Sequence, residues 1–364
     1  MALAASLPET IRLDIGDPAF DSPEHVVWAA NDAASTGRTH YTPSAGIPEL
    51  RSRLADKILA RNGYRTTPDR VIVSQGASQG LFTALTATTE PGDEVLLPNP
   101  AWPNYLMMSQ LLRIRPRTYQ LTRRTDFLPT VDQLASLVSP HTRVLLINSP
   151  SNPTGTLIDA ARMQKIVDFA EQHDLWIVSD ECYDEIVFDD SFISPATLNT
   201  ARVISAYSFS KTYAMTGWRI GYLTAPETIS GAIAKCQESL LACVSEPTQW
   251  AALAALTGPQ DQVRLMRETY RSRCAAALDA LRDSPLLPTE PRGAFYIWLD
   301  ISATGLSDHD FTLRLLKEHG VAVAPGNAFG TAGAGFVRLS LTAADADVAE
   351  GVRRIVRFAA ETLT

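Results

Sequence analysis

From residue 208 to residue 222 the chain reads Ser208-Phe209-Ser210-Lys211-Thr212-Tyr213-Ala214-Met215-Thr216-Gly217-Trp218-Arg219-Ile220-Gly221-Tyr222. One lysine lies between two small hydroxyl residues, and an arginine follows eight positions later. A lysine amine can condense with an aldehyde to form a Schiff base. A phosphate beside it would need hydroxyl donors and a planar guanidinium, which Ser208 and Arg219 offer. Taken alone, the stretch can also be a polar turn between two strands that carries a surface lysine.

The pattern S-x-S-K-x(5)-G-x-R-x-G-Y resembles the cofactor-lysine signature of the class I/II aminotransferases, which are pyridoxal phosphate (PLP) enzymes of fold type I. The resemblance extends from Gly16 to Arg338, nearly the whole chain. It implies that Lys211 holds PLP, with Ser208 and Arg219 on the phosphate. It also implies an α/β fold with a large, doubly wound, mainly parallel sheet domain and a smaller α+β domain.

Hydrophobic patterning predicts the same architecture independently. Short apolar runs alternate with helical periodicity, which favours a buried, mainly parallel sheet with helices on both faces. Ligands of such sheets bind beyond the carboxyl ends of the strands, where the loops 76–78, 148–155, 180–183 and 208–211 fall. The expected strands cover 71–74, 94–97, 144–148, 175–179, 202–206 and 220–224, with helices at 78–89 and 159–173.

After Pro226 the elements become fewer and more separated, as in an α+β layer. We expect a large domain over 41–258 and a small domain formed by 1–40 and 259–364, with the boundary near Gly258-Pro259. The expected elements are helices at 229–256, 260–282, 308–319 and 343–362, and strands at 294–299 and 336–341.

Two further motifs fit the resemblance. Residues 148–155 read Asn-Ser-Pro-Ser-Asn-Pro-Thr-Gly, and residues 179–183 read Ser-Asp-Glu-Cys-Tyr. The resemblance places Asp180 against the pyridine nitrogen of the cofactor, where an opposite charge favours the protonated ring. It places Tyr183 and Asn152 on the phenolic oxygen of the cofactor. Without Lys211 downstream, Asp180 would be interpreted as a helix N-cap.

The remaining cofactor contacts come from three segments. Gly76-Ala77-Ser78-Gln79-Gly80 begins a helix, whose backbone N–H groups and Ser78 hydroxyl can bind phosphate; an ordinary N-cap serine has the same pattern. Trp102 matches the aromatic side chain that stacks on the cofactor ring in the family and borders the substrate. Tyr41 matches a tyrosine that reaches the phosphate of the neighbouring subunit, which implies a homodimer.

Two positions are expected to hold the α-carboxylate of the substrate, beside Asn152. Arg338 matches the carboxylate-binding arginine of the family. The planar guanidinium of an arginine can pair with a carboxylate through two parallel hydrogen bonds. The alternation of Val337, Leu339 and Leu341 puts Arg338 on the other face of its strand. Gly16 would approach the same carboxylate with its backbone; Gly16-Asp17-Pro18 is otherwise a turn.

Composition and charge argue against several other classes of protein. The chain has 364 residues, 45% of them hydrophobic and 20% charged, as in a globular protein with a sizeable core. A net charge of −8 without a basic tract argues against a nucleic-acid partner. No apolar run reaches the ~20 residues of a membrane helix, and residues 1–8 lack the features of a signal peptide. The four cysteines and six histidines show no metal-ligand spacing. We expect a cytoplasmic protein with reduced thiols and no metal.

The expected activity is PLP-dependent transfer of an amino group between an α-amino acid and a 2-oxo acid, with Lys211 moving the proton. A C–S lyase, or a cyclising or decarboxylating enzyme on the same scaffold, would share these motifs. A PLP-sensing regulatory domain would need a DNA-binding segment, for which little chain remains, and a catalytically inactive binding protein would have no need to keep Lys211, Asp180 and Arg338 together.

The substrate side chain is the least determined feature. The segment after Trp102, residues 104–112, offers no lysine or arginine, and Met107 and Met108 are adaptable apolar side chains. We therefore expect a neutral, hydrophobic or aromatic amino donor. Aspartate stays an alternative, because Arg38 or Arg292 could supply a cation from a loop or from the partner subunit.

Overall fold

A seven-stranded sheet forms the centre of the larger part of the molecule. The computed structural model describes residues 4, 6–7, 9–189 and 191–363. The strand order is β2-β8-β7-β6-β5-β3-β4; β8 runs antiparallel to both neighbours and the other pairs are parallel. The strands are β2 (Val71–Ser74), β3 (Glu94–Asn99), β4 (Arg115–Gln120), β5 (Thr142–Asn148), β6 (Trp176–Asp180), β7 (Val203–Ser208) and β8 (Gly221–Thr224). The expected mainly parallel sheet is confirmed.

Helices cover both faces of this sheet, which explains why its inner strands are mainly apolar and buried. The edge strand β4 differs, because its Arg115 and Arg117 are exposed. Leu145 and Ile147 of β5 pack with α7 on one face, and the alternate residues Val144 and Leu146 pack with α4 on the other. The helices of this part are α3 (Pro48–Lys57), α4 (Gly76–Thr88), α5 (Asn104–Leu111), α6 (Val131–Leu137), α7 (Ala160–Gln172), α8 (Phe209–Thr212) and α9 (Glu227–Leu241).

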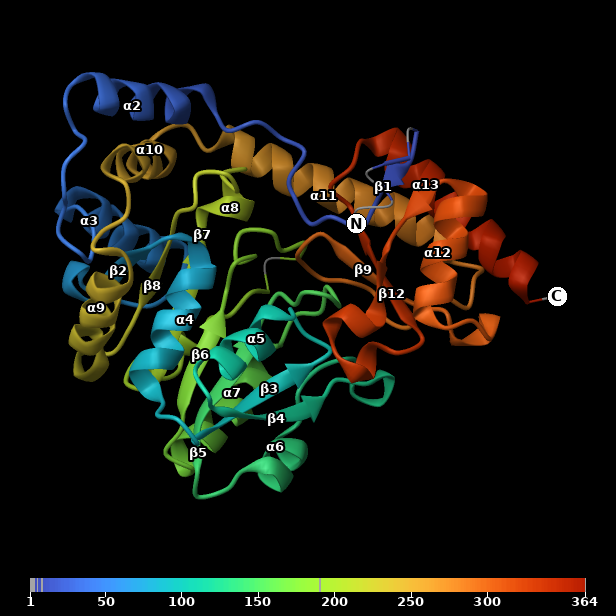
Figure 1. Cartoon of the computed structure of the whole chain (residues 1–364), viewed down its shortest axis with the longest axis horizontal. Helices are drawn as coiled ribbons and strands as arrows, with labels where there is room; N and C mark the ends of the chain where they lie inside the picture. Colours follow the sequence, from blue (N-terminus) through green and yellow to red (C-terminus); the bar gives the residue numbers. More distant parts are fainter. Residues whose placement is uncertain (1–3, 5, 8, 190, 364) are drawn as a thin grey trace.

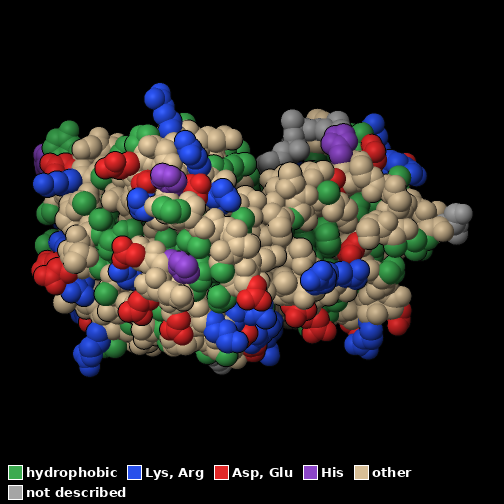
Figure 2. Space-filling model, turned by 90° about the horizontal axis from the view of Figure 1, so that it is seen from below, with side chains coloured by type: hydrophobic (Ala, Val, Ile, Leu, Met, Phe, Trp, Pro, Cys, Tyr) green, Lys and Arg blue, Asp and Glu red, His purple; other side chains and the backbone are tan. Residues whose placement is uncertain are grey.

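A second hydrophobic core lies around the C-terminal residues. The antiparallel sheet β11-β12-β9 carries helices α11, α12 and α13, and Figure 1 shows α11 extending from beside α10 to α13. Figure 2 shows the two parts as unequal lobes. The elements are β9 (Tyr296–Asp300), β10 (Val321–Ala322), β11 (Ala324–Pro325), β12 (Phe336–Ser340), α11 (Asp261–Leu281), α12 (Asp308–His319) and α13 (Asp345–Thr362).

The N-terminal segment contributes to both cores. Strand β1 (Ile11–Arg12) pairs in parallel with β10, and Leu13 is buried in the second core. Helix α2 (Glu24–Ser35) instead packs on α10 (Glu246–Thr257), and its Val26 and Ala30 belong to a core of the large sheet. The segment between them crosses from one part to the other. The domain boundaries at residues 40 and 258 stay a prediction.

One expected helix is wrong in extent. Residues 229–256 form two helices, α9 and α10, because the chain turns at Ala242, whose φ is +62°. Pro247 then lies in the first turn of α10, where a missing N–H costs nothing. The sequence Ser245-Glu246-Pro247 carried this signal, but the apolar periodicity on either side of it masked the interruption.

None of the described helices is long and apolar enough to cross a lipid bilayer. Among the same residues, no group of three or more His, Cys, Asp or Glu side chains is arranged to hold a metal ion.

Candidate active site

A cavity of about 410 Å³ lies at the carboxyl ends of β5, β6 and β7, between the large sheet and β9 and β12 of the small one. Eleven of the twelve residues singled out in the sequence line it: Gly16, Ala77, Ser78, Trp102, Asn152, Asp180, Tyr183, Ser208, Lys211, Arg219 and Arg338. The twelfth, Tyr41, lies outside the cavity with 90% of its surface exposed. The topology thus gathers side chains that are far apart in sequence.

Lys211 is the one lysine among the described residues that lines the cavity. It lies on the short helix α8, which Ser208 caps by accepting a hydrogen bond from the Ser210 backbone N–H at 3.1 Å. The amine Nζ donates to the backbone oxygen of Gly16 at 2.7 Å. Burial lowers the pKa of Lys211, because it disfavours the charged form. The guanidiniums of Arg338 and Arg219 also lower this pKa, whereas the carboxylate of Asp17 raises it. A lowered pKa makes the neutral, nucleophilic amine more accessible.

An anion-binding cradle lies beside Lys211. Helix α4 begins at Gly76, so the first backbone N–H groups of Gly76, Ala77 and Ser78 have no partner within the helix. Arg219 lies over this helix end: a Cβ on Gly76 would come within 2.8 Å of its Nη2. The Arg219 guanidinium is held by a hydrogen bond from Nη1 to the Thr216 oxygen at 2.8 Å. Helix N–H groups, serine hydroxyls and a guanidinium are donors that can bind a phosphate.

Asp180 ends β6 and is 5% exposed. Its Oδ1 accepts a hydrogen bond from the Cys182 backbone N–H at 3.1 Å, and its Oδ2 accepts one from the Tyr105 hydroxyl at 2.6 Å. Burial raises the pKa of this carboxyl, and these hydrogen bonds oppose the rise. A buried carboxylate at this position favours a cation opposite it. Trp102 packs edge-on against Tyr105, with ring centroids 5.5 Å apart, at the same side of the cavity.

The other side of the cavity holds Arg338, from β12, which is 7% exposed. Its Nη1 donates to Asn152 Oδ1 at 2.9 Å and its Nη2 to the Asp14 backbone oxygen at 2.8 Å. Its Nε is buried and has no partner among the described residues. The expectation that Arg338 points away from its apolar neighbours on the strand agrees with this position. A buried guanidinium with an unused donor suits an anionic ligand.

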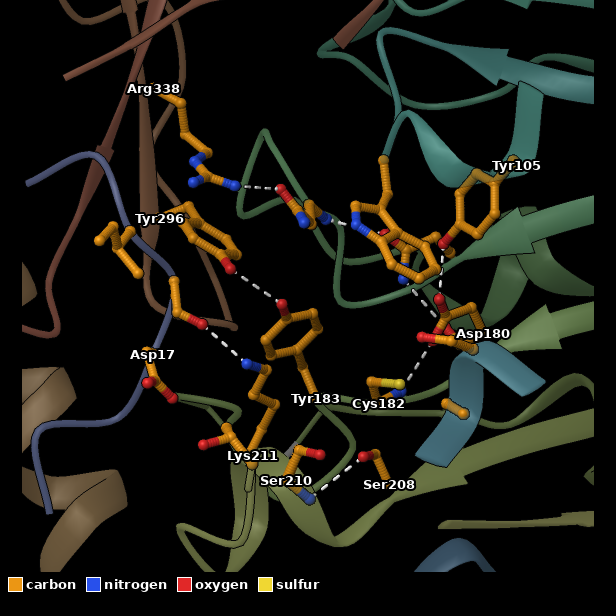
Figure 3. A pocket seen from close by; sticks show the side chains of 18 of the residues that line it. Asp17, Tyr105, Asp180, Cys182, Tyr183, Ser208, Ser210, Lys211, Tyr296 and Arg338 are labelled. Carbon is orange, nitrogen blue, oxygen red and sulfur yellow. Dashed lines mark hydrogen bonds between the residues drawn. The ribbon is translucent and has the colours of Figure 1, made fainter. Parts of the chain in front are cut away.

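Tyr183 and Tyr296 point toward one another at the centre of the cavity (Figure 3), with their hydroxyl oxygens 3.0 Å apart. The Tyr296 ring also packs under the Arg338 guanidinium, whose Cζ lies 4.2 Å from the ring centroid. Gly16 passes so close that a Cβ there would be 2.0 Å from the Tyr296 hydroxyl. Only glycine therefore fits at position 16, and the backbone of this segment reaches the centre of the cavity.

Sequence reasoning missed nine of the residues that line the cavity. Two had a signal: Ser210 is part of the lysine motif, and Tyr105 lies three positions after Trp102, in the first turn of α5. Tyr296 offered none beyond strand alternation. The missed residues are Asp14, Ile15, Asp17, Tyr105, Asn148, Cys182, Ser210, Thr216 and Tyr296.

Comparison with known proteins identifies the family. The model of the family "Aminotransferase class I and II" matches residues 8–355. The chain belongs to this family. It is 37% identical to an aspartate aminotransferase of Pyrococcus abyssi over 99% of this chain and 94% of that protein. It is 36% identical to an arginine–pyruvate transaminase of Pseudomonas aeruginosa over 98% of this chain and 91% of that protein.

Solved structures agree. The structure of an aromatic aminotransferase from Pyrococcus horikoshii superposes with a TM-score of 0.93 at 37% identity, covering 99% of this chain and 98% of that one. The protein is accordingly a PLP-dependent aminotransferase of fold type I, as the lysine motif predicted.

The residues present fit PLP. The cradle at the start of α4 suits a phosphate, and the hydroxyls of Ser78 and Ser210, which make no hydrogen bond to another described side chain, can donate to it. The buried Asp180 carboxylate suits a pyridinium nitrogen, and Lys211 supplies the one cavity-lining amine. Three buried tyrosines, Tyr105, Tyr183 and Tyr296, and the Trp102 ring line the remaining space.

Proposed function

We propose that this aminotransferase moves an amino group between a neutral α-amino acid and a 2-oxo acid, with Arg338 as the anchor of the substrate α-carboxylate. The observation that carries the proposal is the geometry at Arg338: a buried guanidinium with an unpartnered Nε, facing the cavity that also holds Lys211. A carboxylate would pair with this fork, and the nearby Gly16 backbone would limit its position. The α-carbon of the substrate is thereby directed toward Lys211.

Lys211 moves the proton in this proposal. Bound PLP supplies an electron sink that makes the substrate α-carbon acidic. The Lys211 amine, whose pKa burial lowers, accepts the proton from the α-carbon and later returns it as an acid. Before the reaction the same amine holds the cofactor covalently. Its hydrogen bond to the Gly16 oxygen shows that Nζ reaches the segment beside which the substrate would bind.

Asp180 and Tyr183 tune the ring of the cofactor. The Asp180 carboxylate would hold a proton on the ring nitrogen by opposite charge. The Tyr183 hydroxyl and the Nδ2 amide of Asn152, whose Oδ1 accepts from Arg338, would supply donors to the phenolic oxygen. Burial raises the pKa of Tyr183 well above its ordinary value, so it stays a neutral donor.

The charges around the cavity favour a neutral side chain on the substrate. Among the described residues, the cationic side chains that line it are Lys211, Arg219 and Arg338, and each has a proposed role. Asp17 adds a carboxylate at the mouth, next to Gly16. A second substrate carboxylate would meet that negative charge without a cation from this chain, which is costly.

The methionines of α5 do not support a hydrophobic pocket. Met108 is buried in the core of the large sheet, Met107 is 54% exposed, and neither lines the cavity. Arg38 lies over the Trp250 ring at 3.9 Å, and Arg292 pairs with Asp189 at 2.8 Å, so within one chain neither reaches the site. The similarity to aspartate aminotransferases keeps aspartate as the second candidate, with a cation from a partner subunit.

We further propose a homodimer that works in the cytoplasm. Tyr41 is 90% exposed beside Cys243 and Glu246, away from the cavity of its own chain, which suits a tyrosine that serves the neighbouring subunit. The four cysteines are all free thiols, as expected in a reducing compartment. Replacing Tyr41 with Phe should weaken PLP binding in the dimer, measured by equilibrium dialysis, while sedimentation leaves the oligomeric state unchanged.

The reaction type is tested by product analysis. The purified holoenzyme is mixed with single amino acids, and the conversion of its cofactor to the pyridoxamine form is followed by absorbance. One equivalent of 2-oxo acid per active site, without ammonia, is expected. Release of ammonia together with pyruvate from cysteine or cystathionine, with the cofactor unchanged, would assign a C–S lyase instead.

A further inference from the structure

The hydroxyl of Tyr105 makes a short hydrogen bond to the carboxylate of Asp180. Tyr105 lies in the first turn of α5, three positions after Trp102, and its Oη donates to Asp180 Oδ2 at 2.6 Å. Tyr105 is 1% exposed and Asp180 is 5% exposed, so water does not compete for this hydrogen bond. Figure 3 shows the tyrosine hydroxyl directed at the carboxylate.

Asp180 has few groups that stabilise its negative charge. No ion pair among the described residues involves it, although ion pairs elsewhere in the chain are numerous. Burial raises the pKa of this carboxyl, and the groups opposing that rise are Cys182 and Tyr105. Hydrogen bonds to the charged form are therefore what keeps the carboxylate ionised. A protonated Asp180 could not hold a proton on the ring nitrogen opposite it.

Tyr105 is suited to act as a permanent donor. Burial raises its own pKa well above the ordinary value, and the charge of Asp180 raises it further. Tyr105 therefore keeps its proton and donates a hydrogen bond to the carboxylate. The hydrogen bond also orients the carboxylate, because Oδ1 is fixed by the Cys182 N–H at the same time.

We propose that Tyr105 is a positioning residue of the reaction: its hydroxyl keeps Asp180 ionised and turned toward the ring nitrogen of the cofactor. The inference rests on the role proposed above for Asp180. A purely structural role is the competing explanation, since the Tyr105 ring packs edge-on against Trp102 at 5.5 Å. Removal of the hydroxyl alone separates the two, because Tyr105→Phe keeps the ring.

The chain offers a matched control in Tyr119. It is 2% exposed, and its hydroxyl donates to the Leu146 backbone oxygen at 2.8 Å, outside the active-site cavity. Tyr119→Phe therefore removes one equally buried hydroxyl without touching Asp180. Any general effect of losing a buried tyrosine hydroxyl should appear in both variants.

The test uses holoenzyme reconstituted with PLP labelled with 15N in the ring, whose chemical shift reports the protonation of the ring nitrogen. In the wild type and in Tyr119→Phe we expect the protonated form from pH 6 to pH 9. In Tyr105→Phe the ring nitrogen should lose its proton within this range. Its titration midpoint should lie at least one pH unit below that of the wild type. The turnover number should fall by about 10- to 100-fold, the change expected for the loss of one hydrogen bond to a charged group.

A Tyr105→Phe holoenzyme that keeps its ring nitrogen protonated like the wild type would overturn the proposal. Asp180→Asn, measured in parallel, separates this failure from a failure of the proposed function. If Asp180→Asn also leaves the ring nitrogen protonated, the role of Asp180 is wrong and the inference falls with it. If Tyr105→Phe fails to fold or to keep PLP, Tyr105→His, which carries an N–H donor, is measured in the same way. Loss of the ring proton in that folded variant would also contradict the proposal.

Discussion

The Nη1 atom of Arg338 lies 2.9 Å from Oδ1 of Asn152, and this contact joins the two sheets of the molecule across the active site. Arg338 comes from β12 of the small sheet, and Asn152 comes from the loop after β5 of the large sheet. The same side chains are proposed to hold the substrate carboxylate and the phenolic oxygen of the cofactor. With these proposed roles, one buried hydrogen bond would couple substrate binding to the orientation of the cofactor.

This arrangement predicts the effect of shortening the arginine. Arg338→Lys keeps the charge but loses the planar fork, so kcat/KM should fall by about 10- to 100-fold, the effect of losing a charged hydrogen bond. The loss should be similar for every amino acid, because all carry the same α-carboxylate. Steady-state kinetics with leucine, phenylalanine and aspartate measures it, and Arg314→Lys on the exposed face of α12 serves as the control. A loss restricted to aspartate would instead place Arg338 at the substrate side chain.

Substrate choice follows from the charges at the mouth of the cavity. We expect kcat/KM to be higher for leucine and phenylalanine than for aspartate, because Asp17 repels a second carboxylate and each cavity-lining cation of the described chain already has another proposed role. Asp17→Asn should reduce the difference in kcat/KM between the neutral amino acids and aspartate. Added salt should reduce the same difference in the wild type, because it screens the charge of the exposed Asp17. A clear preference for aspartate in the wild type would show that another subunit supplies a cation.

A buried carboxyl behind the active site predicts a pH dependence of stability. Glu181 follows Asp180 and is fully buried; its Oε1 accepts a hydrogen bond from Ser194 at 2.9 Å, and its Oε2 has no partner among the described residues. Burial raises the pKa of Glu181 from 4.5 to about 7. The folded state therefore binds a proton more tightly than the unfolded state, and this group destabilises the fold as pH rises from 4.5 to 7.

Glu181→Gln removes that titration. The free energy of unfolding of the variant, relative to the wild type, should increase between pH 5 and pH 8 by up to roughly 3 kcal/mol. Urea unfolding of the holoenzyme at several pH values measures this difference. Glu171→Gln, an exposed position on α7, should show no such trend. A pH-independent difference for Glu181→Gln would mean that Glu181 stays ionised in the folded protein.

The sequence predicted the large sheet and most of the cavity because those features have local signals. Except for the polar edge strand β4, the strands of the sheet are short, mainly apolar runs, and Lys211, Asp180 and Asn152 lie in motifs at or directly after the ends of such runs. The break between α9 and α10 was missed because it depends on one residue with positive φ, Ala242, in apolar surroundings. Tyr296 was missed because its role arises from Gly16, Tyr183 and Arg338, which only the tertiary fold brings to it.

The position of Tyr41 marks a different limit. Nothing in a single chain places a residue that serves a neighbouring subunit, and in this structure Tyr41 contacts solvent rather than the cavity. The expectation that Tyr41 serves the neighbouring subunit came only from the resemblance to the family. The other proposed site residues line the cavity of the single chain, so their charge and burial can be examined directly.

Lys211 is the residue proposed to hold the cofactor and to move the proton. The most direct measurement reduces the yellow holoenzyme with borohydride, digests it and maps the cofactor-bearing peptide by mass spectrometry. We expect one modified residue, Lys211, and an unmodified Lys57, which is also largely buried but pairs with Asp184. Lys211→Ala should give no reduced adduct and should lose turnover by orders of magnitude. An adduct on Lys57, Lys165 or Lys235 in the wild type would show that another lysine holds the cofactor and that Lys211 does not.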